Sequence, residues 1–312
     1  MNINRNKIKN PVARAGHDPF VTQKNGCYYY CYSHKGSLWI NKHHKLQDAV
    51  QFEGKKIWTP EPEKMFSKNI WAPELHFLQE KWYVYFAADD GNNENHRMFV
   101  LESETKDPMS NYSFVGKITD PSDRWAIDGT VLERTNKLYF IWSGWEEKAN
   151  IQQNIYIAEM TDPKTILSPR ILISKPDFDW EKIGNPLVNE GPQVLKNEKD
   201  VFIIYSASGS WTDNYCLGQL KLIGTDPLNP KSWKKHPAPV FTGTETVFSP
   251  GHASFVKSLD GKEDWIVYHT AIEKGAGWKR DVCIKKFRWN EDGSPNFGAP
   301  IQKGIEFDEP SE

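Results

Sequence analysis

The sequence contains neither a long hydrophobic run nor a concentration of positive charge. No stretch approaches the roughly 20 apolar residues that a membrane-spanning helix requires, so we expect no membrane partner. Lysine and arginine total 39 against 41 acidic residues, which gives a formal net charge of −2. Because no basic patch is visible, we also expect no nucleic-acid partner.

Cysteine is scarce, with four residues in a chain of 312. Cys27 and Cys31 lie in one expected strand, where a rise of about 3.3 Å per residue separates their Cα atoms by roughly 13 Å, too far for a disulfide. Free thiols are typical of reducing compartments. The first 16 residues also contain no apolar segment of the kind found in signal peptides. We therefore expect a cytoplasmic location.

Helical periodicity is almost absent, and only residues 45–50 are consistent with a turn of helix. Aromatic residues, in contrast, reach 13% of the chain and include 13 tryptophans. Many lie in short β-rich runs that are separated by Gly, Pro, Asn and Asp, which indicates strands joined as hairpins.

One pattern occurs five times: a polar or small residue starts a short apolar segment, and an aromatic strand follows about ten residues later. The five starting residues are Asp18, Ala72, Asp128, Glu190 and His252. Each unit has the material for four antiparallel strands, which predicts an all-β, five-bladed β-propeller around a central channel. A linear solenoid is the alternative, but it would have atypical terminal repeats.

The repeat predicts one propeller domain over residues 1–312. We expect its blades to start near residues 17, 71, 127, 189 and 251. Residues 1–16 would supply an outer strand that closes the ring onto the last blade.

The first position of the repeat carries an acid in three copies: Asp18, Asp128 and Glu190. If the innermost strands line the channel, these carboxylates converge in a small space, where like charges push their pKa values apart. One acid can then stay ionised while another stays protonated, as glycoside hydrolysis requires. Taken singly, an Asp before Pro or Gly is more often a turn residue, so the combination carries the prediction.

Six short motifs resemble glycoside hydrolase family 43, a family of arabinofuranosidases, arabinanases and xylosidases built on five-bladed propellers. They are GHDPF (16–20), WAPEL (71–75), IDGTV (127–131), NEGPQV (189–194), YSASGSWTDNYCLG (205–218) and SPGHASF (249–255). The resemblance runs in order from residue 16 to about residue 290.

The resemblance implies a role for each acid. Asp18 would be the general base that activates water, Glu190 the general acid, and Asp128 the residue that orients Glu190 and raises its pKa. Family members invert configuration, so we expect the acid and base to stand roughly 6.5–9.5 Å apart. His252 matches a family histidine near a channel ion, and we expect any Ca²⁺ there to be held mostly through water. The chemistry itself requires no cofactor.

Further residues are candidates for substrate binding. Trp71 could stack on the sugar or simply pack in the channel wall, and Ile127 could form an apolar wall. Arg280 matches a family arginine that contacts the sugar, the alternative being an exposed loop cation. The loop tryptophans Trp145, Trp211 and Trp278 could line the rim or belong to the core. We also consider His17, His34 and Glu74 as residues within reach of the pocket.

These inferences together predict an inverting, exo-acting α-L-arabinofuranosidase that releases terminal arabinose from arabino-oligosaccharides. A β-D-xylosidase or an endo-arabinanase of the same family is the nearest alternative. A non-catalytic sugar-binding propeller is the alternative from another class, and it would have no need of three channel carboxylates.

Overall fold

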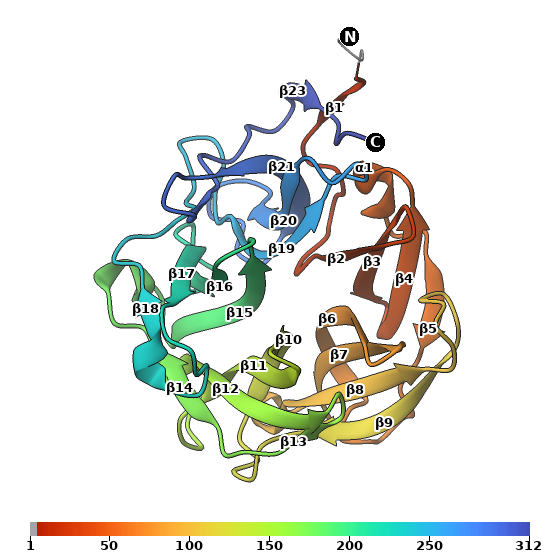
Figure 1. Cartoon of the computed structure of the whole chain (residues 1–312), viewed down its shortest axis with the longest axis vertical. Helices are drawn as coiled ribbons and strands as arrows, with labels where there is room; N and C mark the ends of the chain where they lie inside the picture. Colours follow the sequence, from red (N-terminus) through yellow and green to blue (C-terminus); the bar gives the residue numbers. More distant parts are fainter. Residues whose placement is uncertain (1–4) are drawn as a thin grey trace.

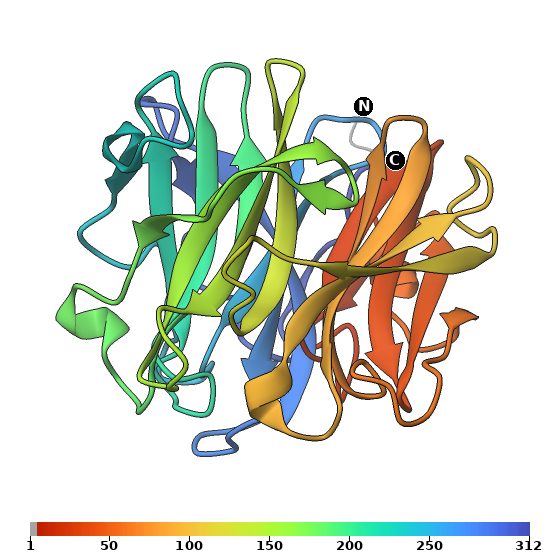
Figure 2. The same ribbon diagram turned by 90° about the horizontal axis from the view of Figure 1, so that it is seen from below.

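The computed structural model describes residues 5–312, most of which form antiparallel β-units. Figure 1 shows these units arranged in a ring around a central space, and Figure 2 shows their strands running between the two faces of the ring. The all-β propeller expected from the repeat is thereby confirmed, and the central space is where the innermost strands of all units meet.

The hydrogen-bonded strands follow one another within each unit, from the centre of the ring outward. The first unit holds β2 (Phe20–Lys24), β3 (Cys27–His34), β4 (Ser37–His43) and β5 (Lys55–Trp58). The second holds β6 (Lys68–Leu78), β7 (Lys81–Asp89), β8 (Arg97–Ser103) and β9 (Tyr112–Ile118). The third holds β10 (Ala126–Arg134), β11 (Lys137–Trp145), β12 (Gln152–Asp162), β13 (Thr165–Ile166) and β14 (Ile171–Ser174).

The fourth unit holds β15 (Leu187–Lys196), β16 (Val201–Ala207), β17 (Cys216–Leu222) and β18 (Trp233–Lys235). The fifth holds β19 (Gly251–Lys257), β20 (Asp264–Ala271), β21 (Arg280–Trp289) and β22 (Pro295–Asn296). A short parallel pairing of β12 with β15 links the third and fourth units. The remaining elements are β1 (Lys7–Lys9), β23 (Glu306–Asp308), α1 (Leu46–Ala49) and the 3-10 turns η1 (Asn93–Asn95), η2 (Asp179–Glu181) and η3 (Pro230–Ser232).

The aromatic strands are buried on both faces because each unit packs between two neighbours. In β3, Tyr28, Tyr30 and Tyr32 pack against the fifth unit, whereas Tyr29 and Cys31 pack against the second. This alternation follows from the two-residue period of a strand. It also explains why β3 reads as a nearly continuous apolar run rather than as an alternating one.

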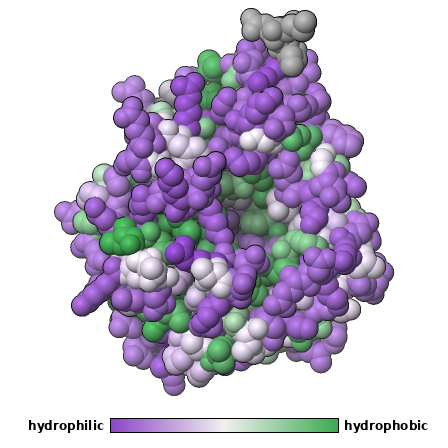
Figure 3. All heavy atoms as spheres, in the orientation of Figure 1, coloured by the Kyte–Doolittle hydropathy of each residue, from purple (hydrophilic) through white to green (hydrophobic). Residues whose placement is uncertain are grey.

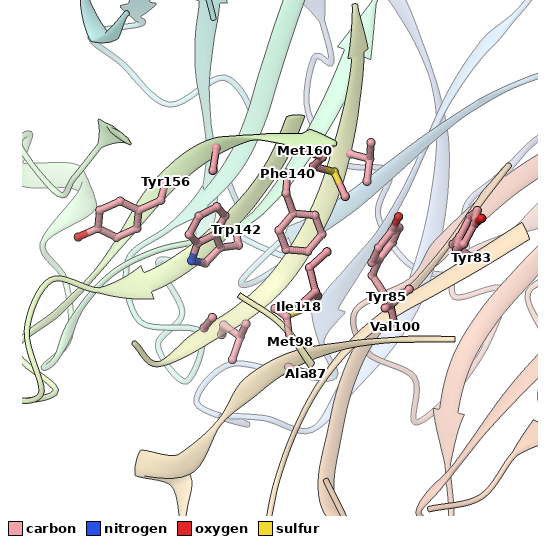
Figure 4. Close-up of a cluster of buried hydrophobic side chains, with 14 of the residues drawn as sticks. Tyr83, Tyr85, Ala87, Met98, Val100, Ile118, Phe140, Trp142, Tyr156 and Met160 are labelled. Atoms are coloured by element: carbon pink, nitrogen blue, oxygen red, sulfur yellow. The ribbon is translucent and has the colours of Figure 1, made fainter. Parts of the chain in front are cut away.

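Five hydrophobic clusters hold the ring together, one between each pair of adjacent units. Figure 4 shows the cluster between the second and third units, where Tyr85 and Met98 face Phe140 and Trp142. The cluster between the first and fifth units is equivalent to the others. The ring is therefore closed by the same kind of contact that joins its other units.

The N-terminal segment adds to this closure, although residues 1–4 lie outside the described part of the chain. Ala13 bridges Val282 of β21, and the Asn10 side chain exchanges two hydrogen bonds of 2.9 Å with the backbone of Ile284. The expected contact with the last blade is therefore present. The regular strand β1, however, pairs with β23 and not with β21.

Figure 3 shows a largely hydrophilic face that is hollowed near its middle. No helix within residues 5–312 has the length and apolar character needed to cross a bilayer.

Candidate active site

In or just before each innermost strand, one of the five equivalent residues near the channel adopts the left-handed backbone conformation. These residues are Asp18 (φ 46°), Ala72 (φ 42°), Asp128 (φ 57°), Gly191 (φ 54°) and His252 (φ 46°). In β6, β10, β15 and β19 the strand register shifts at this point, which marks a β-bulge. A left-handed conformation costs about 1–2 kcal/mol for a residue other than glycine. Such bulges redirect side chains and are frequent beside active sites.

The observed strand register corrects the predicted repeat position of one acid, Glu190. In the fourth unit the left-handed position belongs to Gly191, which adopts that conformation without a steric penalty. Glu190 lies one residue earlier, paired with Ser206, at the position that Trp71 and Ile127 occupy in their own units. The three acids therefore converge on the channel from two different repeat positions, not from one.

A cavity of about 370 Å³ brings the predicted residues together at the channel. Its walls contain all three acids and seven other predicted residues: His17, Trp71, Ile127, Trp211, His252, Trp278 and Arg280. The complete lining is His17, Asp18, Trp71, Asn93, Trp125, Ile127, Asp128, Asn150, Gln153, Glu190, Ser210, Trp211, His252, Trp278 and Arg280.

Asp18 is surrounded by nitrogen atoms. Its Oδ1 lies 3.1 Å from His252 Nδ1, 3.4 Å from His269 Nδ1 and 3.8 Å from Arg280 Nη1. Its Oδ2 lies 3.0 Å from His17 Nδ1. The backbone N–H of Asp18 also donates to His269 Nδ1 at 3.1 Å, which fixes the carboxylate against the fifth unit.

These neighbours keep Asp18 ionised. Burial by itself acts to raise the pKa of Asp18, but His252, His17 and His269 outweigh it and hold the pKa well below its usual range. Burial lowers the pKa of His252, so at neutral pH this ring assists mainly as an N–H donor. Asp18 in turn raises the pKa of His17, which can supply positive charge. Asp18 is thus a carboxylate at neutral pH.

Glu190 is held in the opposite state. Burial raises its pKa to about 7, and the negative charge of Asp18 acts in the same direction. The Tyr215 hydroxyl, which donates to Glu190 Oε1 at 2.8 Å, opposes this shift. A protonated Glu190 can therefore donate a proton near neutral pH.

Asp128 lies beside this acid and is buried as well. Its Oδ2 accepts a hydrogen bond of 2.9 Å from the backbone N–H of Gly191, which joins β10 to β15. Burial, and then the charge of Glu190, raise the pKa of Asp128 well above its usual value. The two acids titrate as a coupled pair, so ionising either one makes the other harder to ionise.

Two aromatic walls face the cavity. Trp71 stacks on the buried ring of His96 with the ring centroids 4.0 Å apart, and His96 Nδ1 lies 2.9 Å from Asp89 Oδ2. On the other side, Trp211 and Trp278 meet edge to face at 6.0 Å. Trp278 is 67% exposed, so this wall rises to the rim of the cavity.

Trp145 does not belong to the cavity lining, contrary to its prediction as a substrate-binding residue. It is buried at the end of β11 and stacks on Trp125 with centroids 4.7 Å apart. Trp125, which the sequence analysis missed, forms the wall in its place. Its position immediately before β10, two residues from Ile127, was the available signal.

Two other candidates also lie outside the cavity lining. His34 lines a neighbouring pocket, and Glu74 is buried with its carboxylate 2.8 Å from His76. The sequence analysis also missed Tyr215 and His269, which contact Glu190 and Asp18 directly. Tyr215 lies inside the motif at residues 205–218, which was the available signal, whereas His269 lies in β20, outside the innermost strands and outside the six motifs.

The donor set does not fit a calcium ion held directly by protein ligands. Within residues 5–312, no three His, Cys, Asp or Glu side chains are gathered as a metal-binding group. His252 directs Nδ1 at Asp18 rather than at a cluster of oxygen atoms. An ion bound through water beside His252 stays a prediction.

The chain is similar to named arabinofuranosidases. It is 35% identical over 311 residues to an "Extracellular exo-alpha-(1->5)-L-arabinofuranosidase" of Streptomyces avermitilis, covering 95% of this chain and 64% of that protein. A protein of the same name from Streptomyces chartreusis is 33% identical, with 84% of this chain and 81% of that protein covered. The chain thus spans just under two thirds of the length of the first relative.

The expected cytoplasmic location is contradicted by these comparisons, because both relatives are named extracellular. The cysteines were a misleading signal. All four are free and also buried, and a buried thiol is shielded from oxidants in any compartment.

Structure and sequence agree on the family. The crystal structure of an α-L-arabinofuranosidase from Lactobacillus brevis superimposes with a TM-score of 0.86 at 34% identity, covering 95% of this chain and 98% of that one. The sequence profile of Glycosyl hydrolases family 43 matches residues 8–295. The chain therefore belongs to glycosyl hydrolase family 43.

Proposed function

We propose that the protein is an inverting, exo-acting α-L-arabinofuranosidase that releases terminal arabinose from arabino-oligosaccharides. One observation carries the proposal: a single cavity holds an ionised carboxylate, Asp18, and a buried acid, Glu190, whose pKa is about 7. Glycoside hydrolysis with inversion needs such a pair, in which one carboxyl group is ionised and acts as base while the other is protonated and acts as acid. The names of the relatives support arabinose as the sugar.

In the proposed reaction, Asp18 accepts a proton from a water molecule as the water oxygen bonds to the anomeric carbon. The bond from that carbon to the leaving oxygen breaks at the same time, and Glu190 gives its proton to this oxygen. Water and leaving group lie on opposite faces of the sugar, so the configuration inverts. The reaction ends with Asp18 protonated and Glu190 ionised, and exchange with solvent restores both.

Asp128 acts on Glu190 and not on the sugar. Its Oδ2 accepts a hydrogen bond from the N–H of Gly191, the residue next to Glu190, and so would help to hold the general acid in position. Trp71 and Ile127 would contact the faces of the sugar, while Arg280 would hold its hydroxyls beside Asp18. The Trp211 wall would contact the next sugar toward the rim.

A xylosidase or an endo-arabinanase would use the same acid and base, so the test has to report the sugar and the cleavage position. We suggest proton NMR of a fresh digest of α-1,5-linked arabinotriose. The proposal predicts β-arabinose and arabinobiose as the first products. Initial release of α-arabinose would contradict inversion. Cleavage of xylobiose but not of arabinotriose would transfer the proposal to a xylosidase, and binding without cleavage of either would favour a sugar-binding propeller.

A further inference from the structure

Ser210 stands in the cavity wall between the candidate general acid and the rim. It belongs to the loop 208–215, which joins β16 to β17 in the fourth unit. The loop 272–279, which joins β20 to β21 in the fifth unit, lies against it through the contact of Trp278 with Trp211. Ser210 lines the cavity and is 9% exposed. Its position therefore allows it to contact groups of both loops and of the catalytic centre.

The Ser210 hydroxyl connects Trp278 with Glu190. The indole N–H of Trp278 donates to Ser210 Oγ at 3.1 Å. The same hydroxyl forms a hydrogen bond with Glu190 that acts to lower the pKa of this acid. A serine hydroxyl has one hydrogen and two acceptor lone pairs, so it can accept from the indole while it donates to the ionised carboxylate. In such a chain each hydrogen bond polarises the next and strengthens it.

The backbone of Ser210 is tied to the base by a second route. Arg280 Nη2 donates to the Ser210 carbonyl at 2.8 Å, and Nη1 of the same guanidinium lies 3.8 Å from Asp18 Oδ1. Because the guanidinium is planar and rigid, these two contacts are fixed relative to each other. The backbone N–H of Gly275 also donates to Asp213 Oδ1 at 2.7 Å, which joins the two loops a second time. The Ser210 carbonyl is thereby held against the side of the cavity that carries the base.

We propose that Ser210 is a positioning residue that couples the rim tryptophan Trp278 to the general acid Glu190. Its carbonyl holds Arg280 beside the base, so one loop residue places groups on both sides of the reacting sugar. Trp278 is 67% exposed, and a ligand that moves its ring acts on the acid through Ser210. The inference rests on the proposed function, because it takes the roles of Asp18 and Glu190 from it.

Several other groups act on Glu190 and have to stay unchanged in a test. The charged and titratable groups that share its cavity or bond to it are His17, Asp18, Asp128, Tyr215, His252 and Arg280. Asp18 acts to raise the pKa of Glu190, whereas Tyr215 and Arg280 act to lower it. The variants below replace none of these groups. A change in the titration of Glu190 can therefore be assigned to the Ser210 hydroxyl.

The test measures kcat/KM for arabinobiose across the pH range. Ser210→Ala removes a bond that stabilises ionised Glu190, so the alkaline limb should move upward by about 0.5–1 pH unit. Ser210→Thr keeps a hydroxyl and should restore the limb of the wild-type protein. Trp278→Phe keeps an aromatic ring at the rim but has no N–H, and it should move the limb in the same direction by a smaller amount.

A double-mutant cycle separates this coupling from a general loosening of the rim. If Trp278 acts through Ser210, Trp278→Phe should leave the limb in place once Ser210→Ala is present. Ser208→Ala is the matched control. Ser208 is buried in the same loop, donates to the Trp180 carbonyl at 2.8 Å and accepts from the Ile183 N–H at 3.2 Å. It is not among the described residues that line the cavity. Its replacement should lower Tm without moving the limb.

An alkaline limb that stays in place in Ser210→Ala would overturn the proposal, as would an equal shift in Ser208→Ala. Additive shifts in the double variant would overturn the coupling to Trp278. If the wild-type protein does not hydrolyse arabinobiose, the proposed function fails instead. Carbon NMR of protein labelled at its glutamate carboxyl groups, with Glu190→Gln to assign the signal, then decides. A higher titration midpoint of Glu190 in Ser210→Ala would support the inference, and an unchanged midpoint would exclude it.

Discussion

Replacing Tyr215 with phenylalanine should shift the pH range of catalysis without abolishing it. Tyr215 reaches the site from outside the channel strands and donates its hydroxyl to Glu190 Oε1 at 2.8 Å. This bond stabilises the ionised form of Glu190 and so lowers its pKa, against the larger effect of burial. Phenylalanine keeps the ring that stacks on His269 at 5.6 Å but removes the bond.

The size of the shift follows from the strength of the bond. A hydrogen bond to a charged group contributes about 1.5–3 kcal/mol, and one pKa unit corresponds to about 1.4 kcal/mol. The Tyr215 hydroxyl also forms a weaker hydrogen bond with protonated Glu190. The pKa shift therefore reflects only the difference in bond strength between the ionised and the protonated forms of Glu190. We expect the pKa of Glu190 to rise by about one unit, from about 7 to about 8.

The sign is fixed by the role of the residue. A general acid acts only while protonated, so kcat/KM falls as pH rises through the pKa of Glu190. In Tyr215→Phe this alkaline limb should therefore move upward, which makes the variant relatively more active than the wild-type protein above pH ~8. The acidic limb, which reports Asp18, should stay in place because burial and three histidines, His252, His17 and His269, dominate the pKa of Asp18.

The assay is kcat/KM for arabinobiose measured across the pH range in both proteins. An alkaline limb that stays in place, or moves downward, would refute the assignment of Glu190 as the general acid. Movement of both limbs together would mean that the substitution had disturbed the whole cavity, and it would contradict the prediction that Tyr215 acts on Glu190 alone.

Three further outcomes are expected. Glu190→Gln should lower kcat by about 10²–10⁴-fold, the usual contribution of a general acid, while calorimetry shows little change in arabinotriose binding; near-normal turnover would exclude the assignment. Trp145→Ala should lower the free energy of unfolding by about 3–5 kcal/mol, as for other buried aromatics, in urea titrations; an unchanged stability would show that its stacking on Trp125 does not contribute. His96→Gln should raise KM more than it lowers kcat, because the ring stacks behind Trp71 and does not line the cavity. A shift in tryptophan fluorescence should accompany the change, and the reverse kinetic pattern would place His96 in the chemistry.

The sequence by itself determined the architecture. Aromatic strands recurring at regular spacing bury both faces by packing against a neighbour on each side, as β3 does. The ordinary first and last repeats favoured a closed ring over a linear solenoid. It also predicted which acids meet, because Asp18 and Asp128 open equivalent strands and equivalent strands end at the same channel.

Only the tertiary structure decided what those acids do and what surrounds them. A protonation state depends on burial and on neighbours that come from other units, such as Tyr215 beside Glu190 and His269 beside Asp18. Which tryptophan faces the cavity is likewise decided by packing between segments, because Trp125 lines the cavity while Trp145, which stacks on it, lies outside the lining. Local sequence specifies strands and turns, whereas distances between residues far apart in the chain arise only when the ring closes.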